Sequence, residues 1–212
     1  MAKKVCYNEA TMKYSEVQME LFDEALCFAT ERHSGQKRKT SDIPYILHPI
    51  EVATIVATMS EDEELLSAAL LHDTVEDTDT TIKEIKKKFG KRVALLVMTE
   101  TEDKREDQPE NLTWKIRKEE SLNILQNTKD KEVKMLWLGD KLANMRSFYR
   151  LYLEKGDKMW QNFNQKDPNE QAWYYFTIIE CMSELKEYAA YNEFVRLVNK
   201  VFENHGGKTN DF

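Results

Sequence analysis

The chain has 212 residues, of which 41% are hydrophobic and 33% are charged, and its formal net charge is −7. This balance is typical of a soluble globular protein and excludes a disordered or fibrous chain. Acidic residues outnumber basic residues, which argues against broad binding to nucleic acids or to anionic membrane surfaces. Neither nucleic acid nor a membrane is therefore expected as a partner.

Targeting signals and cysteine usage both indicate the cytoplasm. The N-terminus has no apolar signal segment, and no uninterrupted apolar run is long enough to span a bilayer. The three cysteines, Cys6, Cys27 and Cys181, are scattered and lack metal-binding spacing. Free thiols in a reducing compartment are the expected state, so the protein is expected to be cytoplasmic.

Helical periodicity dominates the chain, and only six glycines and four prolines interrupt it. These features predict an all-α fold, a single domain over residues 1–212 with roughly eight to ten helices. A motif-bearing core is expected at about 20–150, further helices at about 155–203, a mobile loop at 100–111 and a disordered tail at 204–212. The predicted helices cover residues 15–33 (opened by a Ser15/Gln18 capping box), 48–56, 62–77, 81–89, 93–99, 113–126, 131–154, 168–187 and 192–202.

Residues 68–80 form an apolar helical run that ends in a dense group of carboxylates and one imidazole. At about 100° per residue, His72 lies one turn before Glu76, and Asp73 lies one turn before Asp77. Three neighbouring carboxylates on a mostly buried helix would raise one another's pKa unless a cation neutralised them. This segment therefore predicts a metal site at the end of one helix.

Two residues elsewhere in the chain can complete the ligand set. His48 precedes His72, and Asp140 lies between apolar residues of a later amphipathic helix. Two imidazoles with two carboxylates form a mixed nitrogen–oxygen set that suits Mn²⁺, Fe²⁺ or Zn²⁺. Taken singly, each residue would favour a structural interpretation, His48 as a core histidine and Asp140 as a carboxylate on the helix surface.

Five segments, taken together and in this order, carry a family resemblance. They are Gln36-Lys-Arg-Lys39, Pro44-Tyr-Ile-Leu-His-Pro49, Ala69-Leu-Leu-His-Asp-Thr-Val-Glu-Asp-Thr78, Phe89-Gly90 and Gly139-Asp-Lys-Leu-Ala-Asn-Met145. This pattern resembles the hydrolase domain of RelA/SpoT-type alarmone enzymes, within the HD phosphohydrolase superfamily. The resemblance covers about residues 20–150, and the length of the chain makes it most similar to the stand-alone small alarmone hydrolases.

The resemblance implies a role for each matching residue. The metal ligands of the family correspond to His48, His72, Asp73 and Asp140. The pair that activates the attacking water corresponds to Glu76 and Asp77. The nucleotide contacts correspond to Arg38, Lys39, Asn144 and, more weakly, Ser147. The chain departs from the family at Gly139 and Ala143, where members generally have Ala and an aromatic residue or His. These departures leave the ligand set intact, and Ala143 directly precedes the nucleotide contact Asn144.

The implied activity is metal-dependent hydrolysis of the 3′-pyrophosphate of guanosine tetra- or pentaphosphate, with Mn²⁺ as the first choice of cofactor and Fe²⁺ or Zn²⁺ as alternatives. The partner is then a small nucleotide substrate, and the sequence leaves the oligomeric state open. One alternative keeps the site but changes the substrate, for example to NADPH. A second alternative is a nucleotide sensor without catalysis.

Several further residues have competing interpretations. His33 lies near the basic loop and is expected to be structural, whereas Lys141 could contact a phosphate or lie on the surface. The aromatic residues of the later helices are expected to form core or groove walls rather than a base-stacking platform. They are Tyr149, Tyr152, Trp173, Tyr174 and Tyr175.

Overall fold

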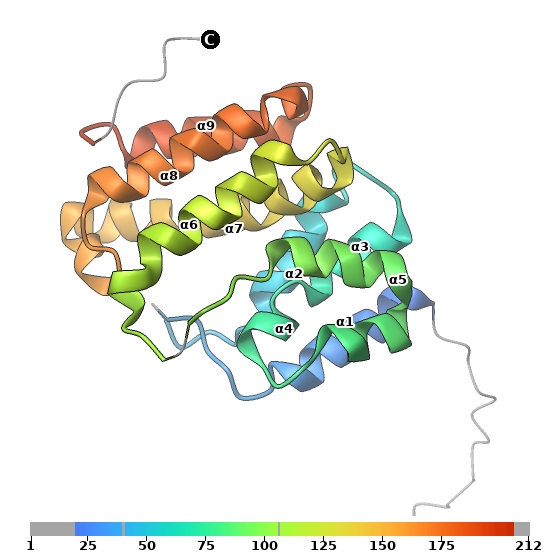
Figure 1. Cartoon of the computed structure of the whole chain (residues 1–212). Coiled ribbons are helices and arrows are strands. Elements are labelled where there is room, and N and C mark those ends of the chain that lie inside the picture. Colours follow the sequence, from blue (N-terminus) through green and yellow to red (C-terminus); the bar gives the residue numbers. More distant parts are fainter. Residues whose placement is uncertain (1–19, 40, 106, 206–212) are drawn as a thin grey trace, which may run out of the picture.

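The computed structural model describes residues 20–39, 41–105 and 107–205, and the regular structure in these ranges is helical (Figure 1). This confirms the predicted all-α class. The capping box at Ser15 and Gln18 and the tail from 206 onward lie outside these ranges. The elements are α1 (Leu21–Arg32), α2 (Leu47–Val56), α3 (Glu63–Leu71), α4 (Thr74–Asp77), α5 (Ile82–Glu100), α6 (Glu110–Asn127), α7 (Lys131–Lys155), the 3₁₀ helix η1 (Gly156–Asn162), α8 (Pro168–Cys181), the 3₁₀ helix η2 (Ser183–Leu185) and α9 (Ala189–Val201).

Side-chain caps explain where several helices begin. Asp62 accepts a hydrogen bond from the Leu65 amide at 2.8 Å, which satisfies a donor in the first turn of α3. Thr81 caps α5 in the same way, and aspartates cap α7 and α8. The predicted starts at 62, 81, 131 and 168 therefore rest on real caps. None of the helices in the described ranges combines the length and apolarity needed to cross a membrane.

The prediction of one continuous helix through the acidic cluster is wrong. Helix α3 ends at Leu71, and the short α4 begins only at Thr74, so His72 and Asp73 lie in the turn between them. The hydroxyl of Thr74 donates to the Leu71 carbonyl oxygen at 2.6 Å, a local bond that competes with the helical ladder. The histidine and aspartate thus leave the helix where a straight helix would have continued.

Two other predicted boundaries also differ. The predicted helices at 81–89 and 93–99 both belong to α5, which kinks at Gly90, where φ is 91° and ψ is 172°. A residue with a side chain rarely adopts this backbone conformation, so glycine explains the predicted stop there. The predicted helix 168–187 ends earlier, at Cys181, and continues as η2.

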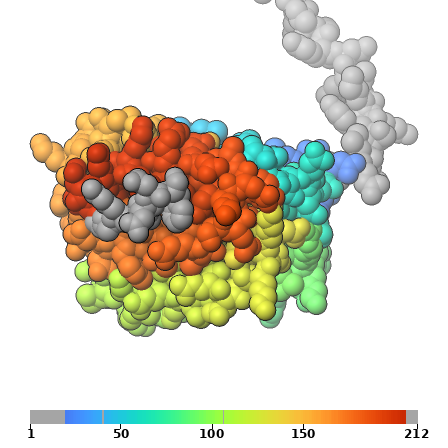
Figure 2. All heavy atoms as spheres, turned by 90° about the horizontal axis from the view of Figure 1, so that it is seen from above, coloured from blue at the N-terminus to red at the C-terminus, as the bar shows by residue number. Residues whose placement is uncertain are grey.

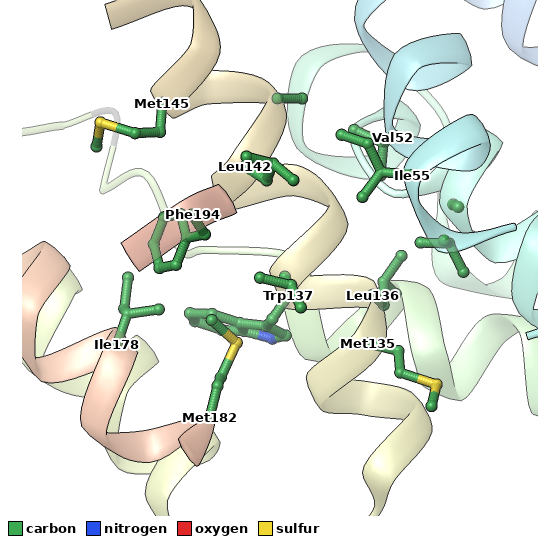
Figure 3. Close-up of a cluster of buried hydrophobic side chains, with 14 of the residues drawn as sticks. Val52, Ile55, Met135, Leu136, Trp137, Leu142, Met145, Ile178, Met182 and Phe194 are labelled. Carbon is green, nitrogen blue, oxygen red and sulfur yellow. The ribbon is translucent and has the colours of Figure 1, made fainter. Parts of the chain in front are cut away.

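Helix α7 runs through the centre of the fold and separates two halves of the core. Figure 3 shows Trp137 beside Ile178, Met182 and Phe194 of the C-terminal helices. Val52 and Ile55 of α2 lie on the other side of α7, and all these side chains are buried. Because α7 packs on both α2 and α9, its residues are fixed from both sides.

Gly139 of α7 allows α2 to approach closely. A Cβ at this position would lie 2.7 Å from Val56 Cγ2 and 3.3 Å from the Val52 carbonyl oxygen. A contact of 2.7 Å is essentially never seen for a real Cβ, and one of 3.3 Å is tighter than most, so a side chain at this position would force its neighbours to shift. The close approach brings His48, at the start of α2, towards Asp140, which directly follows Gly139.

We expect Gly139→Ala to destabilise the protein by about 1–3 kcal/mol, the usual cost of overpacking a close-packed core. The double variant Val56→Ala/Gly139→Ala should recover part of that loss, because it removes the methyl group that clashes. Denaturant unfolding of the two single variants and the double variant measures the coupling between the two positions. Purely additive losses would contradict the proposed contact.

The C-terminal helices both complete the core and reach the site. Helices α8 and α9 form a large part of the face seen in Figure 2. Ile178 and Phe194 are fully buried against α7, whereas Tyr174 and Tyr175 line the pocket that also contains His48, Asp73 and Asp140. The expectation that these aromatic residues are core or groove walls therefore holds for Tyr174 and Tyr175.

Candidate metal and nucleotide site

Four side chains from three parts of the chain converge at one end of the pocket. His48 is the second residue of α2, His72 and Asp73 lie in the turn between α3 and α4, and Asp140 lies in the middle of α7. His48 Nε2 is 3.0 Å from Asp140 Oδ1 and 3.4 Å from Asp73 Oδ2. His72 Nε2 is 3.1 Å from Asp73 Oδ2 and 3.7 Å from Asp140 Oδ1. The structure thus brings together all four of the predicted ligands.

The donor atoms of this cluster fit a divalent cation. His72 Nδ1 donates to the Ala69 carbonyl oxygen at 2.8 Å, which leaves the lone pair on Nε2 for a ligand bond. Nε2 is buried and makes no hydrogen bond of good geometry in the described structure, although Asp73 Oδ2 lies 3.1 Å away. Neighbouring ligands of a cation with bonds of about 2.1 Å lie about 3.0–3.4 Å apart, close to the separations observed here. His48, His72 and Asp140 are all buried, so a cation held by them would be shielded from solvent.

The charges of the cluster support one another in the absence of a cation. Burial opposes ionisation of Asp73, but His72 outweighs it and holds the pKa of this carboxyl well below its usual range. Burial likewise opposes the charge of His72, but Asp73 and Asp140 raise the pKa of its imidazole well above the ordinary value. A divalent cation would therefore replace a proton on His72, so its binding is expected to weaken at lower pH.

The basic loop after α1 is held over the cluster by a tight hairpin. Tyr45 N donates to the Gln36 carbonyl oxygen at 2.9 Å, and Arg38 N donates to the Ile43 carbonyl oxygen at 3.1 Å. The Tyr45 hydroxyl then donates to Asp73 Oδ2 at 2.6 Å. This contact ties the loop to a proposed metal ligand.

Arg38 and Asn144 form one wall of the pocket. Arg38 Nη2 donates to Asn144 Oδ1 at 2.9 Å, and its guanidinium lies 5.5 Å from the centre of the Tyr45 ring. Asn144 Nδ2 in turn donates to Asp140 Oδ1 at 2.7 Å. Lys39 and Ser147 also line the pocket. All four predicted nucleotide contacts therefore share the cavity with the metal cluster.

Glu76 and Asp77 lie beside the cluster and are held by the segment after α5. Lys104 binds Asp77, and its ammonium lies 3.7 Å from Glu76 Oε1. The backbone amide of Glu102 donates to Glu76 Oε2 at 3.2 Å. Burial, followed by the charges of Asp73 and Glu102, raises the pKa of Glu76 to about 7. A carboxyl group with this pKa can accept a proton near neutral pH.

The segment that was predicted as a mobile loop supplies several of these contacts. Arg117 and Lys118 of α6 bind the two carboxylate oxygens of Glu102 at 3.0 and 2.7 Å. With Lys104 on Asp77, these pairs connect residues 101–105 to both the pocket and α6. The segment is irregular, yet its charged side chains form part of the site.

The structure shows that Lys141 is not a surface residue and that His33 has a structural role. Lys141 is not a surface residue, because its side chain is only 13% exposed and its ammonium lies 2.5 Å from Asp140 Oδ2. His33 is buried and its Nδ1 pairs with Gln36 Oε1 at 2.8 Å, while Gln36 donates to the Asp77 carbonyl oxygen. His33 therefore supports the loop next to the site, as expected for a structural histidine.

Most of the chain matches a known protein family. The HD domain family matches residues 25–165, which is more than half of the chain and includes all four proposed ligands. The chain belongs to the HD domain family. The predicted resemblance is thereby confirmed.

Named relatives narrow the likeness further. The chain is 42% identical over 134 residues to a guanosine-3′,5′-bis(diphosphate) 3′-pyrophosphohydrolase of Aquifex aeolicus, but the match spans only 18% of that longer protein. It is 40% identical over 130 residues to the 3′-pyrophosphohydrolase MESH1 of Danio rerio, covering 60% of this chain and 68% of that protein. The match therefore covers 68% of the second relative but only 18% of the first.

Two solved structures have the same fold. A Listeria monocytogenes crystal structure superposes with a TM-score of 0.63 at 34% identity, covering 76% of this chain and 96% of the other. A metazoan orthologue of SpoT that hydrolyses ppGpp gives the same TM-score at 25% identity, covering 88% and 96%. HD-domain architecture therefore extends over most of the chain.

Three pocket residues escaped the sequence prediction. Tyr45 lies within a quoted motif, but nothing in the sequence indicates that its hydroxyl reaches Asp73. Lys104 and Glu100 lie in a polar stretch that looked like an ordinary loop. The sequence does contain an indication for Glu100. It follows the buried residues Val93, Leu96 and Val97 at helical spacing, so an acidic side chain stands where an apolar one is expected.

Proposed function

We propose that this chain is a cytoplasmic, metal-dependent hydrolase that removes the 3′-pyrophosphate from guanosine tetra- or pentaphosphate, giving GDP or GTP and pyrophosphate. The observation that carries the proposal is the convergence of two imidazoles and two carboxylates next to a Glu–Asp pair, in a chain similar to named 3′-pyrophosphohydrolases. Pocket walls come from the motif region and from α8, which supports one functional domain.

His48, His72, Asp73 and Asp140 are the proposed metal ligands. Mn²⁺ is the preferred candidate for this nitrogen–oxygen set, with Fe²⁺ and Zn²⁺ as alternatives. The bound cation supplies Lewis-acid polarisation of the phosphoryl oxygens. The protein contributes the positions of the donors, which the hydrogen bond from His72 to Ala69 and the bonds from Tyr45 and Asn144 fix in place.

Glu76 and Asp77 are the proposed groups that handle the attacking water. Glu76 orients the water and accepts its proton, and the water oxygen forms a bond to phosphorus. The bond between the phosphorus and the ribose 3′-oxygen breaks, so that pyrophosphate leaves and the 3′-oxygen takes up a proton from solvent. Lys104 holds Asp77 and lies near Glu76, so both carboxyl groups keep their positions while one of them changes charge. This arrangement supports Glu76, rather than one of the metal ligands, as the group that accepts the proton.

The remaining pocket offers room and charge for a nucleotide. Its volume is about 360 Å³, within the usual range of small-molecule sites. Arg38 can stack its planar guanidinium on a base or pair with a phosphate, and Lys39 adds a point charge. Asn144 links this wall to Asp140, which supports a nucleotide held with its phosphate ester at the metal end.

A substrate panel tests the proposal directly. The Mn²⁺-loaded protein should release pyrophosphate from guanosine tetraphosphate faster than it releases phosphate from NADPH or from simple nucleotides. The absence of product at high enzyme concentration would refute hydrolysis, and tight binding without turnover would favour a sensor. Faster turnover of NADPH would replace the substrate while retaining the site.

We expect Arg38→Ala to act mainly through KM. Arg38 contacts Asn144 and lines the pocket but reaches none of the proposed ligands, so its loss should weaken nucleotide binding by about tenfold to 100-fold. Steady-state kinetics on guanosine tetraphosphate measure the change. Lys37→Ala is the control, because this neighbouring cation points to Asp42 and is exposed. A large fall in kcat with unchanged KM would place Arg38 in the chemical step instead.

A further inference from the structure

Next to the proposed metal ligands lies a recess that the proposed chemistry does not use. It is formed by Glu100 at the end of α5, Lys141 of α7 and Tyr174 of α8, and all three residues line the pocket. Glu100 Oε1 and the Tyr174 hydroxyl are buried and have no hydrogen-bond partner in the described structure. Buried polar atoms without partners are costly, so two of them in one recess indicate a group that binds there.

Lys141 fixes where this recess lies. Its ammonium is 2.5 Å from Asp140 Oδ2, 3.4 Å from Glu100 Oε2 and 4.7 Å from the centre of the Trp137 ring. A single ammonium group therefore separates the carboxyl of Glu100 from a proposed metal ligand. If the phosphate ester of a substrate lies at the metal end of the pocket, the group next to that ester is within reach of the recess.

The chemistry of the recess favours a hydroxyl group over a phosphate. The charge of Lys141 is already neutralised by the carboxylate of Asp140, whose Oδ2 lies 2.5 Å from the ammonium, so little positive charge remains to bind an anion. Burial raises the pKa of Glu100 to about 8 and raises that of Tyr174 well above its ordinary value, while the nearby Lys141 opposes both changes. A carboxyl and a phenol both donate and accept hydrogen bonds, as a bound hydroxyl requires.

We propose that Glu100, together with Tyr174, binds the ribose hydroxyl adjacent to the hydrolysed phosphate ester, and that Glu100 is thereby a specificity-determining residue for ribonucleotides over deoxyribonucleotides. Carboxylates of other nucleotide sites bind ribose hydroxyls in the same way. The inference rests on the proposed function for the position of the ester. For a 3′-phosphorylated guanosine nucleotide, the hydroxyl in question is the 2′-hydroxyl.

Binding of two matched nucleotides tests the recess without relying on turnover. Isothermal titration calorimetry of the Mn²⁺-loaded protein should show about tenfold tighter binding of guanosine 3′-monophosphate than of its 2′-deoxy analogue. Glu100→Leu should abolish that preference, and Tyr174→Phe should reduce it. Glu100→Gln should retain most of it, because an amide of the same size still donates and accepts.

Glu119→Gln provides the control, because Glu119 is an exposed residue of α6 and the change removes the same charge. It should leave the ratio of the two affinities unchanged. Equal binding of both nucleotides by the unaltered protein would overturn the proposal, as would a retained preference in folded Glu100→Leu. A ribose preference that Glu100→Leu abolishes would support the recess even if guanosine tetraphosphate were not hydrolysed, so the two proposals can fail separately.

Discussion

Asp140→Asn should lose bound metal and activity together. Asp140 Oδ1 lies 3.0 Å from His48 Nε2 and 3.7 Å from His72 Nε2, and the side chain of Asp140 is buried. An amide retains the shape and can still accept the bond from Asn144, but it lacks the negative charge that a divalent cation requires. Because Lewis-acid catalysis is worth several kcal/mol, we expect the rate of pyrophosphate release to fall by about 10³-fold or more.

Metal content provides the readout that is independent of turnover. Elemental analysis after dialysis against Mn²⁺ should find the metal in the unaltered protein and almost none in the variant. Added Mn²⁺ should raise the melting temperature of the former only, because a ligand stabilises the state that binds it. Asp79→Asn is the matched control, since Asp79 is an exposed carboxylate close in sequence to the cluster. Undiminished metal binding by Asp140→Asn would remove Asp140 from the ligand set.

The fold class and the members of the site could be predicted from the sequence because both depend on local patterns. Helical periodicity and the helix starts at 62 and 81 depend on a few neighbouring residues, and the structure confirms those starts. His72 and Asp73 are adjacent in the chain, so their proximity needed no tertiary information. The partners His48 and Asp140 were recognised through family motifs, which carry tertiary information indirectly.

The parts that could not be predicted depend on contacts between distant segments. The break between α3 and α4 arises where a threonine hydroxyl competes with the helix, and such competition is decided by packing. Lys104 looked like one charge of a polar loop, but the path of the chain after α5 places it on Asp77, 27 residues earlier. Glu100 and Lys141 come into contact only because α5 packs against α7, and the sequence does not show this packing.

Glu76→Gln should separate metal binding from turnover. Glu76 lies near the cluster but makes its contacts with the Glu102 amide and Lys104, not with the proposed ligands. The amide keeps its size and can still accept the hydrogen bond from Glu102, but it cannot accept a proton from the attacking water. We therefore expect normal Mn²⁺ content and a kcat reduced by about 10²–10⁴-fold, the usual contribution of a general base.

The pH profile identifies the group more specifically than the rate alone. The carboxylate is the active form of a base, so activity should rise with pH through the pKa of Glu76, which is about 7 without the cation. A nearby divalent cation favours the carboxylate and moves this limb to lower pH. Glu76→Gln should remove the limb, whereas Glu84→Gln, which alters a half-buried ion pair with Arg32 away from the pocket, should preserve both rate and profile. An unchanged acidic limb in Glu76→Gln would assign the proton transfer to another group, and Asp77 would then be the residue to test.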